Sequence, residues 1–235
     1  MPHVFGIEHA LYILVSVIVG VVMYKTIVRF ASTDAKKVKA IRIIGGVLLA
    51  AIIWNRLSIA ITRDNFAGLL PGTFCGASSL FLSVGALVLK KNSPYFHCVA
   101  FVGLYGGLTT LIYPDFIGQS DSVFYQMTIS GLVHHTVMVF LFVMMVRLGF
   151  LVPDLKKWAY FPMGLAFYMV YGLFLITELG YGDAMLIHEP ILDGTPLNWL
   201  VMGVIALSLH GAVLGVWTML KGRATEQQQT IASTH

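Results

Sequence analysis

The chain has 235 residues, of which 57% are hydrophobic and only 11% are charged. A soluble domain of this length carries about a quarter charged residues, so the composition excludes an ordinary soluble fold and indicates a membrane protein. The net charge of +4 is weak evidence for nucleic-acid binding, because membrane proteins concentrate lysine and arginine in cytoplasmic loops.

Seven apolar runs are long enough to be transmembrane helices, because a hydrocarbon core roughly 30 Å thick needs about 20 apolar residues. Lipid leaves free backbone groups without partners, which favours helices, and the runs are too long for barrel strands. In chain order, the predicted spans are 8–28, 40–60, 69–89, 95–113, 124–147, 158–178 and 197–220. The sequence predicts an all-α, seven-transmembrane-helix bundle in one domain at 1–223, followed by a disordered tail at 224–235.

Lysine and arginine are confined to alternate connections between these spans. They occupy the first, third and fifth connections and the tail, whereas the fourth and sixth connections have acidic residues instead. Only the second connection, with Arg63, is ambiguous. The positive-inside rule therefore predicts an N-terminus outside, a cytoplasmic C-terminus and a multi-pass protein of the cell (cytoplasmic) membrane.

Polar side chains inside the spans are functional candidates, because ionisable groups are costly in lipid. Most of them fall in the outer half of the predicted bundle, which predicts a polar cavity open to the outer leaflet or the extracytoplasmic space. The candidates are Glu8, His9, Trp54, Asn55, Arg56, Cys75, Tyr113, Asp115, His134, His135, Glu178 and His210.

Structural explanations exist for several of these residues. Arg56 and Glu8 are also explained by side chains that reach to the outer interface. Asp115 follows Pro114 and is compatible with a turn or a helix cap. His210 is compatible with a core histidine bonded to a backbone carbonyl, and a buried free cysteine such as Cys75 often behaves as a small hydrophobe.

The candidates permit nucleophilic chemistry at Cys75. A cysteine becomes a nucleophile when a base or a positive field favours its thiolate, and the start of a helix supplies partial positive charge. A histidine of the fifth span is the candidate base, and Asp115 or Glu8 is the candidate group that orients it. Adjacent His134 and His135 point roughly 100° apart on a helix, so one of them faces the cavity, and we favour His134.

Metal binding is the rival chemistry, because the cysteine and histidine candidates are also zinc ligands. No HxxxH or CxxC spacing occurs in the chain. We therefore predict neither a metal nor another cofactor.

Short motifs resemble the YwaF family of bacterial integral membrane proteins. Leu-Pro-Gly-Thr-Phe-Cys at 70–75 resembles its Leu-Pro-x-x-x-Cys motif, and 107–115 resembles its stretch ending in Pro-Asp. Segment 129–134 resembles its histidine-bearing helix, 190–196 resembles its last outer loop, and Glu8-His9 fits its early histidine. The chain departs from the family at Gly72-Thr73-Phe74, where many members have a polar His or Gln, and at Tyr181-Gly182-Asp183, where the family has an Asn-Tyr stretch.

The YwaF family is similar to a eukaryotic seven-helix membrane acyltransferase that moves fatty acyl chains between phospholipids with a cysteine and a histidine. The resemblance implies Cys75 as nucleophile and His134 as its partner, with membrane lipids as substrates. The alternative is a non-catalytic protein that binds or transports a lipid or a small molecule, or a sensor. Assembly into a homo-oligomer is left open.

The predicted orientation is testable with reporter fusions. Reporters placed after Lys91 and after Lys157 follow basic connections, so both are expected to report a cytoplasmic location. A periplasmic signal from either fusion would contradict this topology.

Overall fold

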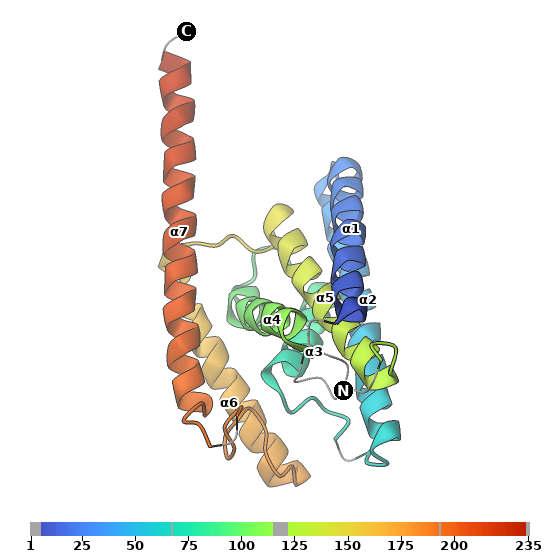
Figure 1. The fold of residues 1–235 in the computed structure, drawn as a ribbon. Helices are drawn as coiled ribbons and strands as arrows, with labels where there is room; N and C mark the ends of the chain where they lie inside the picture. The colour runs from blue at the N-terminus through green and yellow to red at the C-terminus, as the bar shows by residue number, and fades with distance from the viewer. Residues whose placement is uncertain (1–5, 67, 115–121, 193, 234–235) are drawn as a thin grey trace.

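The computed structural model describes residues 6–66, 68–114, 122–192 and 194–233, with side chains as far as Lys221. These parts of the chain are helical and contain no strand. Seven α-helices and a short 3₁₀ helix, η2, follow one another along the chain (Figure 1). Their bounds are α1 Ile7–Phe30, α2 Asp34–Thr62, α3 Phe74–Val88, α4 Pro94–Ile112, α5 Gln126–Arg147, η2 Leu155–Lys157, α6 Tyr160–Leu179 and α7 Trp199–Ser233.

Six of the described helical segments are long and apolar enough to cross a membrane, and α3 is apolar but shorter. The qualifying segments are α1, α2, α4, α5, the stretch of η2 with α6, and the first 23 residues of α7. Large apolar side chains also cover their outer surfaces, as expected when lipid is the solvent. The protein is therefore a helical membrane protein.

The start of α3 differs from the predicted span 69–89. Thr73 has an extended backbone and its hydroxyl accepts a hydrogen bond from Gly76 N at 3.2 Å, so it caps a helix that begins at Phe74. Pro71, which falls in the first turn of the predicted span 69–89, lies before this cap. The 15 residues of α3 rise only about 22 Å, which is less than the hydrocarbon thickness of roughly 30 Å.

Helices α2 to α5 form the centre of the bundle, and α6 packs against α4. Helix α1 lies on one side of this centre and α7 on the other (Figure 1). The apolar window of α1 has no buried residue, and that of α7 is only 11% buried. The central helices therefore hold the core, and a candidate site is to be sought among them.

Glycines allow some helices to approach closely. A Cβ added at Gly107 would lie 2.8 Å from Val139 Cγ2, and one at Gly103 would lie 3.0 Å from Met138 Sδ. Gly103 and Gly107 form a GxxxG pair in the sequence, and such pairs let helices approach closely, here α4 and α5. The sequence contains a second pair with this spacing, Gly211 with Gly215, but a Cβ at either position meets no described atom within 4 Å.

The connections α2–α3 and α6–α7 lie together at the end of the bundle where α1 begins (Figure 1), which we call the N-terminal face. Met185 N donates to Gly72 O at 2.8 Å, and the Tyr181 hydroxyl donates to Leu70 O at 2.8 Å. Burial raises the pKa of Tyr181, opposed by nearby Arg56 and by this hydrogen bond. The α6–α7 connection thus covers the segment that leads into α3.

The end of the chain is helical in the structure as far as Ser233. The sequence predicts a disordered tail at 224–235, whereas α7 continues through 224–233. Ala, Glu and Gln have favourable helix propensity, so an existing helix extends through them at little cost. The single domain at 1–223 stays a prediction.

Gly164 gives a test of the α4–α6 packing. A Cβ at Gly164 would collide with the carbonyl oxygen of Cys98 on α4, which is backbone and has little freedom to move. We expect Gly164→Ala to destabilise the protein by about 1–3 kcal/mol, measured by thermal or denaturant unfolding in detergent. The control Gly215→Ala adds the same methyl where no described atom lies within 4 Å, so it should be neutral or slightly stabilising. Equal stability of the two variants would contradict the packing.

Candidate functional site

The centre of the bundle contains many buried polar side chains at depths where lipid surrounds the protein. Such groups are costly unless they are paired, and the ionisable ones among them are candidates for a functional site. The buried polar residues include His9, Asn55, Ser58, Ser78, Ser79, Ser83, Thr110, Thr128, Ser130, His134, His135 and His210.

Cys75 lies in the first turn of α3, two residues after the capping Thr73. Its sulfur packs directly on Gly106 of α4, where an added Cβ would collide with it. The thiol also forms a hydrogen bond with the side chain of Thr110, one turn further along α4. The side chain therefore points into the bundle and away from lipid, at the end of α3 where the helix dipole is positive.

His134 of α5 is held by Ser79 of α3. The distance between Ser79 Oγ and His134 Nδ1 is 3.0 Å, and Ser79 also donates to Met138 Sδ at 3.1 Å. A hydroxyl has one proton, so when Ser79 donates to Met138 the histidine donates from Nδ1 to Ser79. In that tautomer His134 Nε2 has a free lone pair, which is the form a general base requires.

Ser79 also links His134 to the neighbourhood of Cys75. Residues four apart share a helix face, so Ser79 lies about 6 Å along α3 from Cys75 on the same stripe. The hydrogen bonds among the described residues join His134 to Ser79 and do not include a bond between Cys75 and a histidine. The two predicted catalytic side chains thus lie on α3 and α5, and Ser79, one turn after Cys75, is the residue of α3 that bonds to His134.

His135 has a different environment from its neighbour. Its Nδ1 lies 2.7 Å from the backbone oxygen of Gly131 on its own helix. Its Nε2 is buried and has no hydrogen-bond partner among the described atoms. The two imidazole centroids are 3.9 Å apart, so the neighbouring rings pack against each other.

Two further predicted residues join helices near this cluster. Asn55 of α2 donates to Ser130 Oγ of α5 at 3.1 Å. His9 of α1 lies with Nε2 2.9 Å from the carbonyl oxygen of Leu111, the residue after Thr110. Both are buried, and they join α2 to α5 and α1 to α4, respectively.

Other predicted residues lie elsewhere. Glu8 accepts hydrogen bonds from Val123 N at 2.7 Å and from the hydroxyl of Ser122 at 3.1 Å, so it anchors α1 to the segment before α5. Trp54, Tyr113 and Glu178 are exposed at the surface of the bundle. Asp115 falls outside the described residues.

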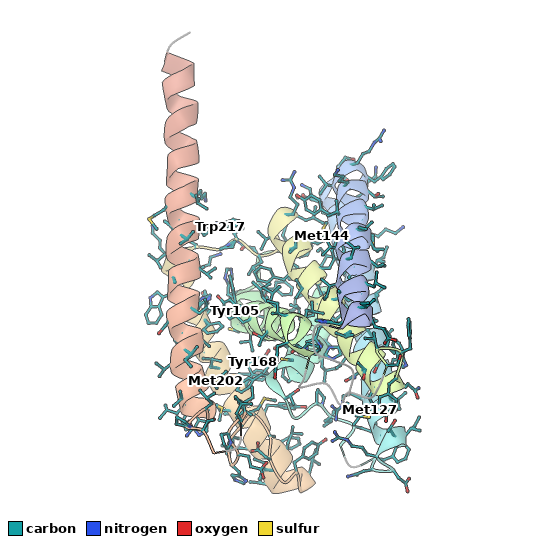
Figure 2. All side chains as sticks on the ribbon, in the orientation of Figure 1. Tyr105, Met127, Met144, Tyr168, Met202 and Trp217 are labelled. Atoms are coloured by element: carbon teal, nitrogen blue, oxygen red, sulfur yellow. The ribbon has the colours of Figure 1, made fainter. Side chains whose placement is uncertain are left out.

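His210 forms a separate cluster between α4, α6 and α7. Its Nδ1 lies 3.2 Å from the hydroxyl of Tyr105, a residue labelled in Figure 2. Its ring stacks on Phe161 with centroids 4.2 Å apart and meets Phe101 edge-on at 4.5 Å. These contacts favour a packing role in which α7 is fixed to the core.

Sequence reasoning did not identify Ser78, Ser79, Thr110 or Tyr168. The hydroxyls of Ser78 and Tyr168 are 2.7 Å apart, and Tyr168, labelled in Figure 2, is fully buried. One signal was available, since Ser78 and Ser79 follow Cys75 by three and four residues and so share its helix face. No sequence pattern places Thr110 or Tyr168 beside them.

Comparison with known sequences places the chain in a family. The sequence model of the TMEM164 family matches residues 4–221, from just before α1 to the last described side chain of α7. The chain belongs to the TMEM164 family. This is a family of transmembrane proteins, which agrees with the long apolar helices of the structure. The name of the family states no activity. No curated protein and no solved structure matches the chain. The resemblance to the YwaF family stays a prediction.

The Ser79–His134 bond is testable by matched serine substitutions. Ser79→Ala removes the partner of a buried imidazole nitrogen, so we expect a loss of about 1–3 kcal/mol of unfolding free energy. Ser83 is equally buried, but its hydroxyl donates to Leu80 O of its own helix. Ser83→Ala should therefore cost much less in the same detergent unfolding assay. Equal effects of the two substitutions would argue against the interhelical bond.

Proposed function

We propose that this member of the TMEM164 family is a membrane acyltransferase or lipid hydrolase with Cys75 as its nucleophile. The observation that carries the proposal is the position of the thiol, which points into the bundle at the start of α3 beside Thr110. A buried polar cluster with a histidine on the facing helix is what covalent acyl chemistry needs. The proposal includes seven spans, an outer location of the N-terminus and the cytoplasmic membrane as the site of action.

The proposed reaction has two steps. His134 takes the thiol proton as the Cys75 sulfur attacks the ester carbonyl of a lipid, and the imidazolium then protonates the leaving alcohol. The carbon–oxygen bond breaks and a thioester forms. In the second step a hydroxyl of an acceptor lipid or of water attacks the thioester, His134 takes its proton, and the proton returns to the departing sulfur.

Ser79 has the role in this proposal that a carboxylate has in a triad. The Nδ1 side of His134 faces the Ser79 hydroxyl, so the ring orientation and the tautomer are set without a negative charge. A neutral orienting group stabilises the imidazolium less than a carboxylate does. Asp115, first proposed for this role, lies outside the described residues, and Glu8 is bonded to Val123 and Ser122.

A non-catalytic lipid-binding, transport or sensor protein is the second candidate. It is favoured by one observation, that the hydrogen bonds of the described residues pair Cys75 with Thr110 and not with a histidine. This candidate requires the same buried cluster but no covalent adduct. The two candidates therefore differ in what happens when the thiol is removed.

Substitution of the two cysteines separates these candidates. We expect Cys75→Ala to abolish acyl transfer or hydrolysis. The reaction is measured by mass spectrometry of mixed phospholipids that have been incubated with the purified protein. Cys98→Ala is the matched control, because Cys98 lies near the start of α4, far along that helix from Thr110, and should leave the rate unchanged. His134→Ala should lower the rate by about 10²–10⁴-fold because it removes the base. The substitution His135→Ala tests whether the neighbouring imidazole is the base instead.

A thioester trapped on Cys75 would support the covalent mechanism directly. If wild type and Cys75→Ala remodel lipids equally and neither forms an adduct, the mechanism is wrong. Retained lipid binding by Cys75→Ala without any turnover in wild type would favour the binding protein.

A further inference from the structure

The α6–α7 connection lies on the chain segment that leads into α3 (Figure 1). Met185 N donates to Gly72 O at 2.8 Å. The Tyr181 hydroxyl donates to Leu70 O, also at 2.8 Å. A Cβ built on Gly72 would lie 3.4 Å from the ring of Tyr181 and 3.7 Å from Ala184 Cβ. The connection and this segment are therefore in van der Waals contact as well as hydrogen-bonded.

The covered segment adjoins the first turn of α3, which contains Cys75. A Cβ added at Gly76 would lie 2.7 Å from Pro71 Cβ, so Pro71 folds back against that turn. On the other side, the Arg56 guanidinium of α2 donates to Gly68 O and holds the segment in place. Cys75 is only partly exposed, and its sulfur packs against α4. Because reacting atoms must approach to about 3–3.5 Å, a bulky ester needs a wider opening at this turn.

Two features of the α6–α7 connection favour movement. Met185 and Leu186 have φ angles of 54° and 58°, a left-handed conformation that costs free energy in residues other than glycine. Gly180 and Gly194, toward the two ends of the connection, also have positive φ, and a Cβ at either position meets no described atom within 4 Å. The connection is thus strained where it touches Gly72, and the chain on both sides can rotate without collision.

The observed position of the connection is nevertheless a packed one. Met185 is 1% exposed, and a Cβ added at Gly172 of α6 would lie 2.8 Å from Met185 Cγ. His188 N donates to Asp183 Oδ1 at 2.9 Å, which closes a turn within the connection itself. A segment that carries its own internal hydrogen bond can move as a unit between a closed and an open position.

We propose that residues 180–192 of the α6–α7 connection form a lid over the first turn of α3, which opens before a bulky ester substrate reaches Cys75. Opening breaks the hydrogen bonds to Leu70 and Gly72 and lets Met185 leave its strained conformation. Entry of a substrate to Cys75 rests on the proposed function, whereas the movement of the lid does not. Labelling of the thiol therefore tests the lid without any turnover.

A disulfide introduced by Gly72→Cys with Ala184→Cys would lock the lid. A Cβ on Gly72 would lie 3.7 Å from Ala184 Cβ, and disulfides join Cβ atoms about 3.5–4.5 Å apart. Both substitutions are made in the full chain with Cys98→Ala, so that Cys75 is the one native thiol left. Ala184→Cys alone, treated with the same oxidant, is the matched control. Peptide mapping by mass spectrometry verifies the cross-link and measures labelling at Cys75.

Two thiol reagents of different size distinguish a lid from a general change at α3. The small reagent is methyl methanethiosulfonate, and the bulky one is a fluorescein maleimide. We expect the disulfide to slow labelling of Cys75 by the bulky reagent at least about tenfold and to change labelling by the small one less than about twofold. Reduction should restore the rate. Equal labelling by the bulky reagent with the lid locked and free would overturn the lid, as would equal slowing of both reagents.

Tyr181→Phe provides a second variant if the disulfide does not form. It removes the bond to Leu70 O and keeps the ring that faces Gly72, so the bulky reagent should label Cys75 about two- to tenfold faster than in wild type. An unchanged rate in this variant would overturn the lid. If labelling follows these expectations while no acyl turnover is found, the lid stands and the catalytic proposal fails.

Discussion

The interhelical hydrogen bond between Ser79 and His134 is the contact on which the arrangement of the polar core depends. It joins α3, which is short, to α5, which is long, at a depth where neither group can turn to water. Because Met138 accepts from the same serine, the pair is satisfied within two helices. Ser79 and Cys75 are one turn apart on the same helix, so the Ser79–His134 bond also fixes the height of Cys75 in the bundle.

A recessed helix start is the second feature that shapes the site. The cap at Thr73 starts α3 later than a full membrane span would, and the preceding segment is irregular and covered by the α6–α7 connection. Irregular backbone at membrane depth is tolerated where protein buries it and satisfies its polar groups. The bonds from Met185 N to Gly72 O and from Tyr181 to Leu70 O have that effect here. Two consecutive residues of the covering connection, Met185 and Leu186, have positive φ angles of 54° and 58°, a conformation that costs free energy outside glycine.

The polar core and the apolar groove beside Arg56 lie on two different sides of α3. The inner side carries the thiol, Ser78 and Ser79, and the outer side contributes Leu80 to the groove near Arg56. This division follows from helical periodicity, because Cys75 and Leu80 are separated by about 140° around the axis.

The amino-acid sequence by itself determined that this is a helical membrane protein, because long apolar runs have few other stable environments. It also singled out Cys75, His134, Asn55 and Arg56, since polar groups within such runs are rare. Only the tertiary structure decided that α3 is shorter than a full span, because that depends on a cap and on a covering connection distant in sequence. It also paired His134 with Ser79, joined Asn55 to Ser130 and left His210 in a separate aromatic cluster. These pairings depend on how helices rotate and slide against one another, and the periodicity of a single helix carries no information about its neighbour.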